Sequence, residues 1–295
     1  MDHIGEYALR KRIMSKLGEI ARDNGHQVTR AQLESFTVGG TPIKLVDQSR
    51  GIRNPKELSC TLSIISDPQS HYGDVIRDDG LMEYAYQSGS VNGVNQKLRI
   101  AMQSRMPIIL FRKLAPAVFM PIMPVYVVHD DPENRRVLIA LDESLAVLSE
   151  IPHHESTLEK AYAERVIRQR LHQPEFRARV LRAYAIRCAI CDLKHGRLLD
   201  AAHIIPDSHA GGTASVTNGI SLCKIHHGAF DANFLGITPD YRVEINSTLL
   251  HEVDGPMLKH GLQEMHGRAL TLPKKTQEAP DRDRLMMRYR EFLTS

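Results

Sequence analysis

The sequence predicts an α+β protein with two domains, the first of them built on a curved or barrel-like mixed sheet. The chain has 295 residues, which is enough for two hydrophobic cores. Short β-type runs separated by Gly, Pro, Asn and Asp fill much of the first half, with only one or two helical stretches among them. The second half instead carries helical stretches and closely spaced Cys and His residues.

The composition is that of a soluble globular protein, with 42% hydrophobic and 25% charged residues. Charged side chains within the first twenty residues argue against a signal peptide, and no apolar run is long enough to span a membrane. Only four cysteines occur, and three of them lie close together in sequence. A cytoplasmic protein without a disulfide framework is therefore expected.

In the N-terminal half, apolar periodicity predicts a helix over 13–21 that stops at Asp23-Asn24-Gly25, and a short helix over 30–35. One further helix is expected over 95–104. Strands are expected at 61–65, 82–86, 107–111, 125–128 and 137–141.

In the C-terminal half, a charged helix over 156–171 should end at Gln173-Pro174 and a second helix should begin at Glu175. A strand is expected over 243–245, a helix from Pro256, and a last helix over 282–292. This pattern divides the chain into a helical segment (1–36), a sheet domain (37–148), a linker helix (149–174), a second domain (175–240) and a C-terminal extension packed on it (241–295).

Two short pairs of metal-binding residue types lie in the second domain, Cys188/Cys191 and Cys223/His226. Each pair has the spacing with which a turn presents two ligands to tetrahedral zinc. A structural Zn²⁺ site is therefore predicted. Free buried thiols are one alternative. A DNA-binding zinc finger is another, although the two pairs are too far apart for a finger motif.

Between and beside these pairs lie His203 in an apolar run, Asn218-Gly219, and His227 followed by Asp231. This pattern, over about 176–231, resembles the HNH endonucleases, which implies a ββα-metal domain that hydrolyses phosphodiester bonds. By the resemblance His203 is the general base, Asn218 braces the loop and orients the base, and His227 belongs to the catalytic site. His227 and Asp231 are i and i+4 on a helix, so both can reach one metal ion, Mg²⁺ or Mn²⁺.

The sequence departs from many HNH enzymes immediately before the expected base. A metal-binding His or Asp is common there, but this chain has Ala202. Asp200, three residues upstream of His203, is the candidate for the missing oxygen ligand. The alternatives are that His203 is a buried core residue and that Asp231 is a turn residue.

Basic residues accumulate between positions 165 and 197, with nine positive side chains against two negative ones, a local net charge of +7. Such a stripe is typical of a surface that contacts nucleic-acid phosphates, although a solvated helix face is the alternative. The residues expected to contact the DNA backbone are Arg177, Arg179, Arg182 and Arg187.

Residues 70–128 resemble the SRA (YDG) domain, an SRA/PUA-like fold, in the stretches 71–74, 78–86, 95–98 and 125–127. That family flips a modified cytosine out of DNA into a pocket, where rings stack on it and a carboxylate reads its edge. The resemblance implies that Tyr72 and Asp74 belong to this pocket, with Tyr84 or Tyr86 as the second ring. The alternative is that both of these tyrosines face the core.

Together the two resemblances imply an endonuclease that restricts foreign DNA carrying 5-methylcytosine or 5-hydroxymethylcytosine. Double-stranded DNA is the expected partner, no membrane is involved, and a homodimer is expected on DNA. Two alternatives stay open. The chain could cut unmodified DNA at a specific sequence, or it could bind DNA with an inert nuclease domain, which Ala202 makes conceivable.

Overall fold

The structure is a computed structural model that describes residues 2–68, 75–77, 79–148, 157–207, 209 and 211–295. The chain divides into two compact units. Unit 1 comprises Met1–Ala21 and His26–Pro174, and unit 2 comprises Arg22–Gly25 and Glu175–Ser295. None of the helices in the described ranges is long and apolar enough to cross a membrane.

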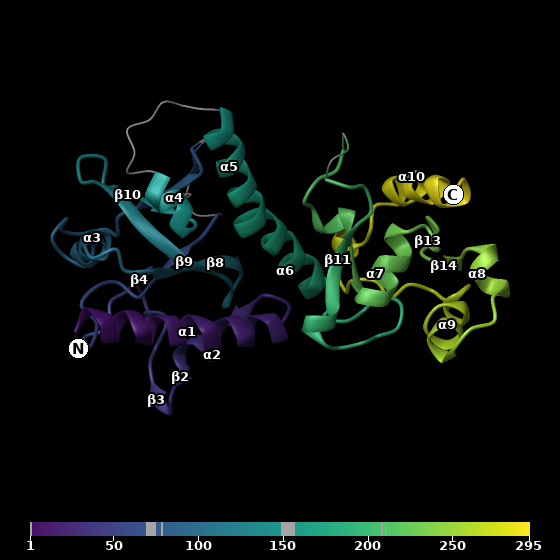
Figure 1. The fold of residues 1–295 in the computed structure, drawn as a ribbon, viewed down its shortest axis with the longest axis horizontal. Helices are drawn as coiled ribbons and strands as arrows, with labels where there is room; N and C mark the ends of the chain where they lie inside the picture. The colour runs from purple at the N-terminus through teal and green to yellow at the C-terminus, as the bar shows by residue number, and fades with distance from the viewer. Residues whose placement is uncertain (1, 69–74, 78, 149–156, 208, 210) are drawn as a thin grey trace. The chain divides into compact units, whose positions relative to one another are not determined.

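Unit 1 is built from short strands interrupted by helices (Figure 1). The strands are β1 (Val28–Thr29), β2 (Thr37–Val38), β3 (Thr41–Pro42), β4 (Ile52–Arg53), β5 (Ser63–Ser66), β6 (Val75–Ile76), β7 (Leu81–Ala85), β8 (Ile108–Ala115), β9 (Val118–Asp131) and β10 (Arg136–Ala140). The helices are α1 (His3–Asp23), α2 (Arg30–Glu34), α3 (Gln96–Gln103), α4 (Glu143–Leu148), α5 (Thr157–Ile167) and the π-helical turn η1 (Arg168–His172).

One mixed sheet of eight strands forms the centre of unit 1. Its order is β4-β5-β8-β9-β10-β7-β6, and β1 pairs with β9 away from this path. The β5–β8 pair is parallel, whereas the other pairs are antiparallel. The described strands thus confirm a mixed α+β fold. They form an open sheet with β4 and β6 at its edges, and no described pairing closes it into a barrel.

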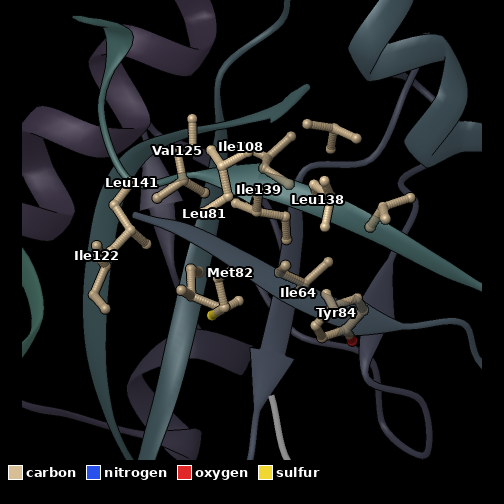
Figure 2. Close-up of a cluster of buried hydrophobic side chains, with 14 of the residues drawn as sticks. Ile64, Leu81, Met82, Tyr84, Ile108, Ile122, Val125, Leu138, Ile139 and Leu141 are labelled. Atoms are coloured by element: carbon tan, nitrogen blue, oxygen red, sulfur yellow. The ribbon is translucent and has the colours of Figure 1, made fainter. Parts of the chain in front are cut away.

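Strand β8 shows how the sheet is held, because alternate side chains enter two different cores. Ile108 and Leu110 belong to a cluster with β7, β9, β10 and α3, part of which Figure 2 shows as side chains pointing toward one another. Ile109 and Phe111 belong to a second cluster with α1 and α2. The sheet is therefore covered on both faces.

The N-terminal helix is part of unit 1 because a buried charge ties it to the sheet. Arg10 on α1 is fully buried and pairs with Glu6 at 2.8 Å. Its Nη1 also donates to the carbonyl oxygens of Thr61 (2.8 Å) and Pro107 (2.9 Å). A buried guanidinium is tolerated only when its donors are satisfied in this way.

Unit 2 is assembled from hairpins and short helices (Figure 1). Its strands are β11 (Leu199–His203), β12 (Gly219–Cys223), β13 (Leu235–Ile237) and β14 (Val243–Ile245). Its helices are α6 (Gln173–Ala183), α7 (Lys224–Asp231), α8 (Ser247–His251), α9 (Pro256–Gly261) and α10 (Arg282–Leu293), with short 3₁₀ turns η2 (Gly196–Leu198), η3 (Val216–Asn218), η4 (Gln263–Met265) and η5 (Thr276–Glu278).

The hydrophobic core of unit 2 draws on the whole C-terminal part of the chain. Val180 on α6, Leu222 on β12 and Phe230 on α7 belong to one cluster, to which Leu270 and Leu285 contribute. The C-terminal residues thus complete the core around the β11–β12 hairpin.

The expected helix break at Gln173-Pro174 is wrong. Elements α5, η1 and α6 follow one another without an intervening loop. The backbone N–H of Gln173 donates to the carbonyl oxygen of Arg168, five residues earlier, as in a π turn. Pro174 has no N–H and crowds the carbonyl of Arg170, so the widened turn relieves the conflict that would otherwise end the helix.

Candidate nuclease site and metal-binding cluster

The candidate catalytic residues lie on a hairpin followed by a helix, β11–β12–α7. Strands β11 and β12 pair antiparallel, with His203 opposite Gly219. Helix α7 begins directly after Cys223, the last residue of β12. The hairpin therefore fixes His203, and α7 carries His227 and Asp231 beside it, with α7 in contact with both strands.

His203 is half-buried at the end of β11 and is stacked against an aromatic ring. Its imidazole lies 4.0 Å from the ring of Phe176, centroid to centroid, with the planes only 13° apart. Burial lowers the pKa of His203 below its ordinary value of 6.5, although the negative charge of Asp207 acts in the opposite direction. The imidazole is therefore neutral near pH 7, as a general base must be.

Asn218 is fully buried and holds the loop that follows His203. Its Nδ2 donates to the carbonyl oxygens of Ile205 (2.9 Å) and Thr213 (3.0 Å). Its Oδ1 accepts the backbone N–H of Ile205 at 3.0 Å. Because all three contacts are to backbone groups, the amide fixes the direction in which the chain leaves His203.

His227 lies between two carboxylates. Its Nε2 is 3.3 Å from Oδ2 of Asp231, one helical turn later on α7. Its Nδ1 is 3.9 Å from Oδ2 of Asp200 on β11. The imidazole and the exposed Asp231 carboxylate are thus adjacent, as the i, i+4 spacing predicts.

The Asp200 carboxylate binds two positively charged side chains. Its Oδ1 accepts from Nε of Arg177 at 3.0 Å, and its Oδ2 accepts from Nζ of Lys224 at 2.5 Å. Burial by itself would raise the pKa of Asp200, but Lys224 and Arg177 outweigh it and hold the pKa below its ordinary range. The carboxylate is therefore charged, and a metal ion could use its Oδ2 only by displacing Lys224.

The three expected catalytic-metal ligands do not form one cluster. In the described part of the chain, the one group of Cys, His and acidic residues close enough to share an ion is Cys188, Cys191, Cys223 and His226. Asp200 lies on the Nδ1 side of His227 and Asp231 lies on the Nε2 side, so one ion cannot bind the imidazole and both carboxylates in this arrangement. Ala202, directly before His203, is fully buried and offers no ligand atom.

The three cysteines and His226 lie with their ligand atoms within 4.8 Å of one another. Nδ1 of His226 is 3.4 Å from Sγ of Cys188 and 3.2 Å from Sγ of Cys223, and Sγ of Cys191 is 4.0 Å from Sγ of Cys223. Tetrahedral Zn–S bonds of about 2.3 Å separate two sulfurs by roughly 3.8 Å, which this geometry matches closely. The cluster could therefore hold one zinc ion.

A further contact fixes which nitrogen of His226 faces the cysteines. Its Nε2 lies 2.8 Å from the carbonyl oxygen of Gly261, at the end of α9. A carbonyl oxygen can only accept a hydrogen bond, so Nε2 of His226 carries the hydrogen and Nδ1 is available to bind a metal. This contact could not be predicted from the sequence, because Gly261 is 35 residues away along the chain.

The four arginines expected on the DNA surface differ in their surroundings. Arg177 is engaged with Asp200 and also donates to the carbonyl oxygens of Gly196 and Leu199. Arg179 pairs with Glu175, and Arg187 pairs with Asp192. Arg182 is exposed, and no ion pair to another described residue is found for it. Asp200 thus neutralises Arg177 from outside the stripe, whereas Glu175 and Asp192 are the two acidic residues already counted within it.

Of the residues expected in the base pocket, Tyr72 and Asp74 lie outside the described residues. Tyr84 and Tyr86 are both buried, on the same side of the chain at and just after β7. The hydroxyl of Tyr84 donates to the carbonyl oxygen of Gly51 at 3.3 Å, and that of Tyr86 donates to Asp130. Both tyrosines also line a cleft of about 730 Å³ in unit 1, together with Gly51, Ile65, Asp67, Ala85, Gln87, Ser88, Gly89 and Arg135.

The hairpin and α7 match a known protein family. Residues 188–238 match the family "HNH endonuclease". No curated protein matches the chain. Unit 2 therefore contains an HNH endonuclease domain, and its hairpin, Asn218 and α7 lie within the matched residues. The protein is accordingly an endonuclease, an enzyme that hydrolyses phosphodiester bonds within a nucleic-acid chain.

Solved structures also match the chain, at low identity. One, described as "Modification dependent TagI restriction endonuclease", is 15% identical, with 88% of this chain and 89% of that chain covered and a TM-score of 0.30. Another, the "Type IV phosphorothioation-dependent restriction endonuclease ScoMcrA", is 17% identical, with 62% and 48% covered and a TM-score of 0.25.

The structure adds two residues near the site that the sequence did not identify. Phe176 covers one face of His203, and Lys224 binds Asp200. Phe176 is one of several apolar residues on an amphipathic helix, and Lys224 is one of many surface lysines. Neither therefore carried a signal that distinguished it before the hairpin and helices were placed.

Proposed function

We propose that the protein is a modification-dependent DNA endonuclease that restricts foreign DNA carrying 5-methylcytosine or 5-hydroxymethylcytosine. The endonuclease activity is supported mainly by one arrangement of residues. His203 is neutral and half-buried on a hairpin, and the helix that follows this hairpin holds His227 and Asp231 side by side. A proton acceptor and a metal-binding pair on one rigid frame are what phosphodiester hydrolysis requires.

In this mechanism His203 accepts the proton of the attacking water, and its partly exposed imidazole gives water access to it. Asn218 keeps the loop after His203 in place through its three backbone contacts. The base therefore approaches the phosphate in one orientation, which removes an entropic part of the barrier.

His227 and Asp231 would hold a divalent ion, Mg²⁺ or Mn²⁺, with Asp200 as a further oxygen donor. The pair of His227 and Asp231 fits such an ion, because one imidazole and one exposed carboxylate leave several positions for water and phosphate oxygens. Asp200 lies on the side of the other ring nitrogen of His227 and would have to move to share the same ion. Such an ion, when bound, stabilises the negative charge that develops on the phosphate. Lys224 keeps Asp200 charged and in place until then.

The Cys188, Cys191, Cys223 and His226 cluster would hold a structural Zn²⁺. Four protein ligands leave no open position for a substrate, which is typical of structural rather than catalytic zinc. The ion would join the loop before the hairpin to the start of α7. It would thus hold His203 and His227 in a common frame.

The reader assignment is supported by the cleft in unit 1. Its lining includes polar groups such as the amide of Gln87, which could recognise the edge of a flipped base. Tyr84 and Tyr86 are only 6% and 8% exposed, so the main stacking ring would be Tyr72. Tyr72 and Asp74 are proposed to complete this pocket. The two tyrosines that line it are held by hydrogen bonds, so the cleft is pre-formed.

The modified base alone would give only mild selectivity, since burial of one methyl group contributes roughly 0.8 kcal/mol, or about fourfold. A homodimer that engages two modified bases would multiply this effect and would suit a double-strand cut. Contacts of Arg177, Arg179, Arg182 and Arg187 with the DNA backbone are proposed to supply binding that does not depend on modification.

A substrate panel tests the proposal. One DNA fragment is prepared unmodified, with 5-methylcytosine, with 5-hydroxymethylcytosine and with phosphorothioate linkages, and cleavage is measured with Mg²⁺ or Mn²⁺. We expect the two modified-cytosine substrates to be cut well above the others. The His203→Ala variant should fold and bind DNA but cut at least about 10²-fold more slowly.

Equal cutting of modified and unmodified DNA would refute the reader assignment and favour a sequence-specific nuclease. No metal-dependent nicking of any substrate by a folded protein would favour the inert DNA-binding alternative. A well-folded His203→Ala protein with most of its activity would remove His203 as the base.

A further inference from the structure

Phe176 lies against the candidate base but has no role in the nuclease assignment. Its ring is stacked on the imidazole of His203 with an interplanar angle of 13°. Phe176 is only 4% exposed and belongs to the same core as Val180 and Leu181 on α6. The aromatic partner of the expected base is therefore a rigid part of the core, in contrast to a mobile surface side chain.

The hairpin is shaped to admit this ring. Gly219 lies directly opposite His203 in the β11–β12 pair. A Cβ atom at position 219 would lie 2.5 Å from Cγ2 of Val180 and 2.8 Å from Cζ of Phe176, which is closer than such atoms can approach. The absence of a side chain at position 219 thus lets α6 press Phe176 against the strand pair, where it reaches His203.

The His203 ring has no competing restraint that would set its plane. Among the described residues no hydrogen bond to either of its ring nitrogens is found. The nearby titratable groups that influence its pKa are Asp207, His227 and Asp231, and none of them is hydrogen-bonded to the ring. Flat contact with Phe176 is therefore what fixes the ring plane and keeps water from one of its faces.

We propose that Phe176 is a positioning residue for the catalytic base: its ring holds the imidazole of His203 in the plane from which it reaches the attacking water. This rests on the assignment of His203 as the base. A base misplaced by about 1 Å can lose up to two orders of magnitude in rate. If the His203 imidazole only rotates about its side-chain bond and stays close to the attacking water, the cleavage rate should fall less, by about tenfold.

The test compares kcat and KM for DNA cleavage by three variants, each checked for folding by circular dichroism and thermal melting. Phe176→Leu keeps an apolar side chain but removes the flat face, and it should lower kcat about tenfold with the KM for DNA unchanged. Phe176→Tyr keeps the face and should restore most of the rate. Leu181→Ala, on the same helix and in the same core, controls for lost packing and should keep kcat in its folded fraction.

A double-mutant cycle separates positioning from general destabilisation. If Phe176 acts through His203, Phe176→Leu should cost nothing further in a His203→Ala background. The proposal is overturned if Phe176→Leu keeps the wild-type kcat, if Leu181→Ala lowers kcat as much, or if the two losses add fully. A His203→Ala protein that cuts normally would instead refute the base assignment itself, so the two failures are distinguishable.

Discussion

Unit 1 and unit 2 are stabilised in different ways, although each carries one of the two candidate sites. Unit 1 has an eight-stranded sheet with side chains buried on both faces. The described strands of unit 2 form two separate two-stranded sheets, and four metal-binding side chains bring the loop before the β11–β12 hairpin next to the start of α7. Because two-stranded hairpins are marginal on their own, unit 2 should depend on a bound ion in a way that unit 1 does not.

Two neighbouring histidines on α7 also differ in their surroundings. His226 is buried, with Nδ1 toward Cys188 and Cys223. His227 is half-buried and lies between Asp200 and Asp231. Successive helix positions point about 100° apart, so one turn of helix carries both a ligand of the proposed zinc cluster and a residue of the proposed catalytic site. Damage to the cluster should therefore reach the catalytic residues.

The largest effect is expected from Cys188→Ser, which removes one of the four cluster ligands. Purified wild-type protein should contain about one zinc ion per chain, and the variant should lose it, since binding at such a site is folding energy. Unit 2 should then unfold and cleavage should become undetectable, whereas unit 1 should keep its own melting transition. Elemental analysis, calorimetry and a cleavage assay measure these three quantities.

Cys60 provides the matched control, because it is the one cysteine outside the cluster and is buried in unit 1. Cys60→Ala should lower the stability of unit 1 and leave the zinc content unchanged. An active wild-type enzyme without zinc would contradict the cluster assignment. A Cys188→Ser protein whose unit 2 melts normally would contradict the dependence of unit 2 on the ion.

The next effect is a pH dependence that belongs to unit 2 alone. Burial lowers the pKa of His203 below 6.5, and His203 must be neutral to act as a base. The acid limb of the single-turnover rate should therefore lie below pH 6.5, where the rate falls about tenfold per pH unit as His203 becomes protonated. DNA binding by unit 1 should not follow this curve.

Asp207 gives a directional check on the same profile. Its negative charge favours protonated His203 and so raises the His203 pKa. Asp207→Asn should consequently move the acid limb to still lower pH. An acid limb above pH 7 in the wild type, or a shift in the opposite direction in this variant, would show that another group controls the profile.

Sequence reasoning reached those parts of the molecule that depend on local spacing. The two Cys/His pairs, the i, i+4 relation of His227 and Asp231, and most of the helices and strands follow from periods of two to four residues. The end of α1 at Asp23 and the start of α9 at Pro256 are confirmed for the same reason, since turn and cap residues act locally.

The parts that sequence reasoning missed depend on contacts between distant segments. The contact of Arg177 Nε with Asp200 was not foreseen, and the +7 stretch is partly neutralised by Asp23 and Asp200, which lie outside residues 165–197. The predicted helix break at Pro174 is wrong, because a π turn accommodates the proline within the helix. Local composition cannot reveal such compensation, because the compensating groups arrive through the fold.

The smallest effect is expected in unit 1, from Gly51→Val in the cleft. A Cβ atom at position 51 would lie 3.0 Å from Nε2 of Gln87 and 3.1 Å from the hydroxyl oxygen of Tyr84, so a valine would narrow the cleft and displace these groups. If the cleft takes the modified base, the preference for methylated over unmodified DNA should fall by about fourfold, the contribution of one buried methyl group. The rate on unmodified DNA should not change, because His203 and α7 belong to unit 2.

Gly255→Val, at a glycine with open space around it, is the control and should keep the full preference. A folded Gly51→Val protein with an unchanged preference would place base recognition elsewhere, while the nuclease assignment of unit 2 would stand.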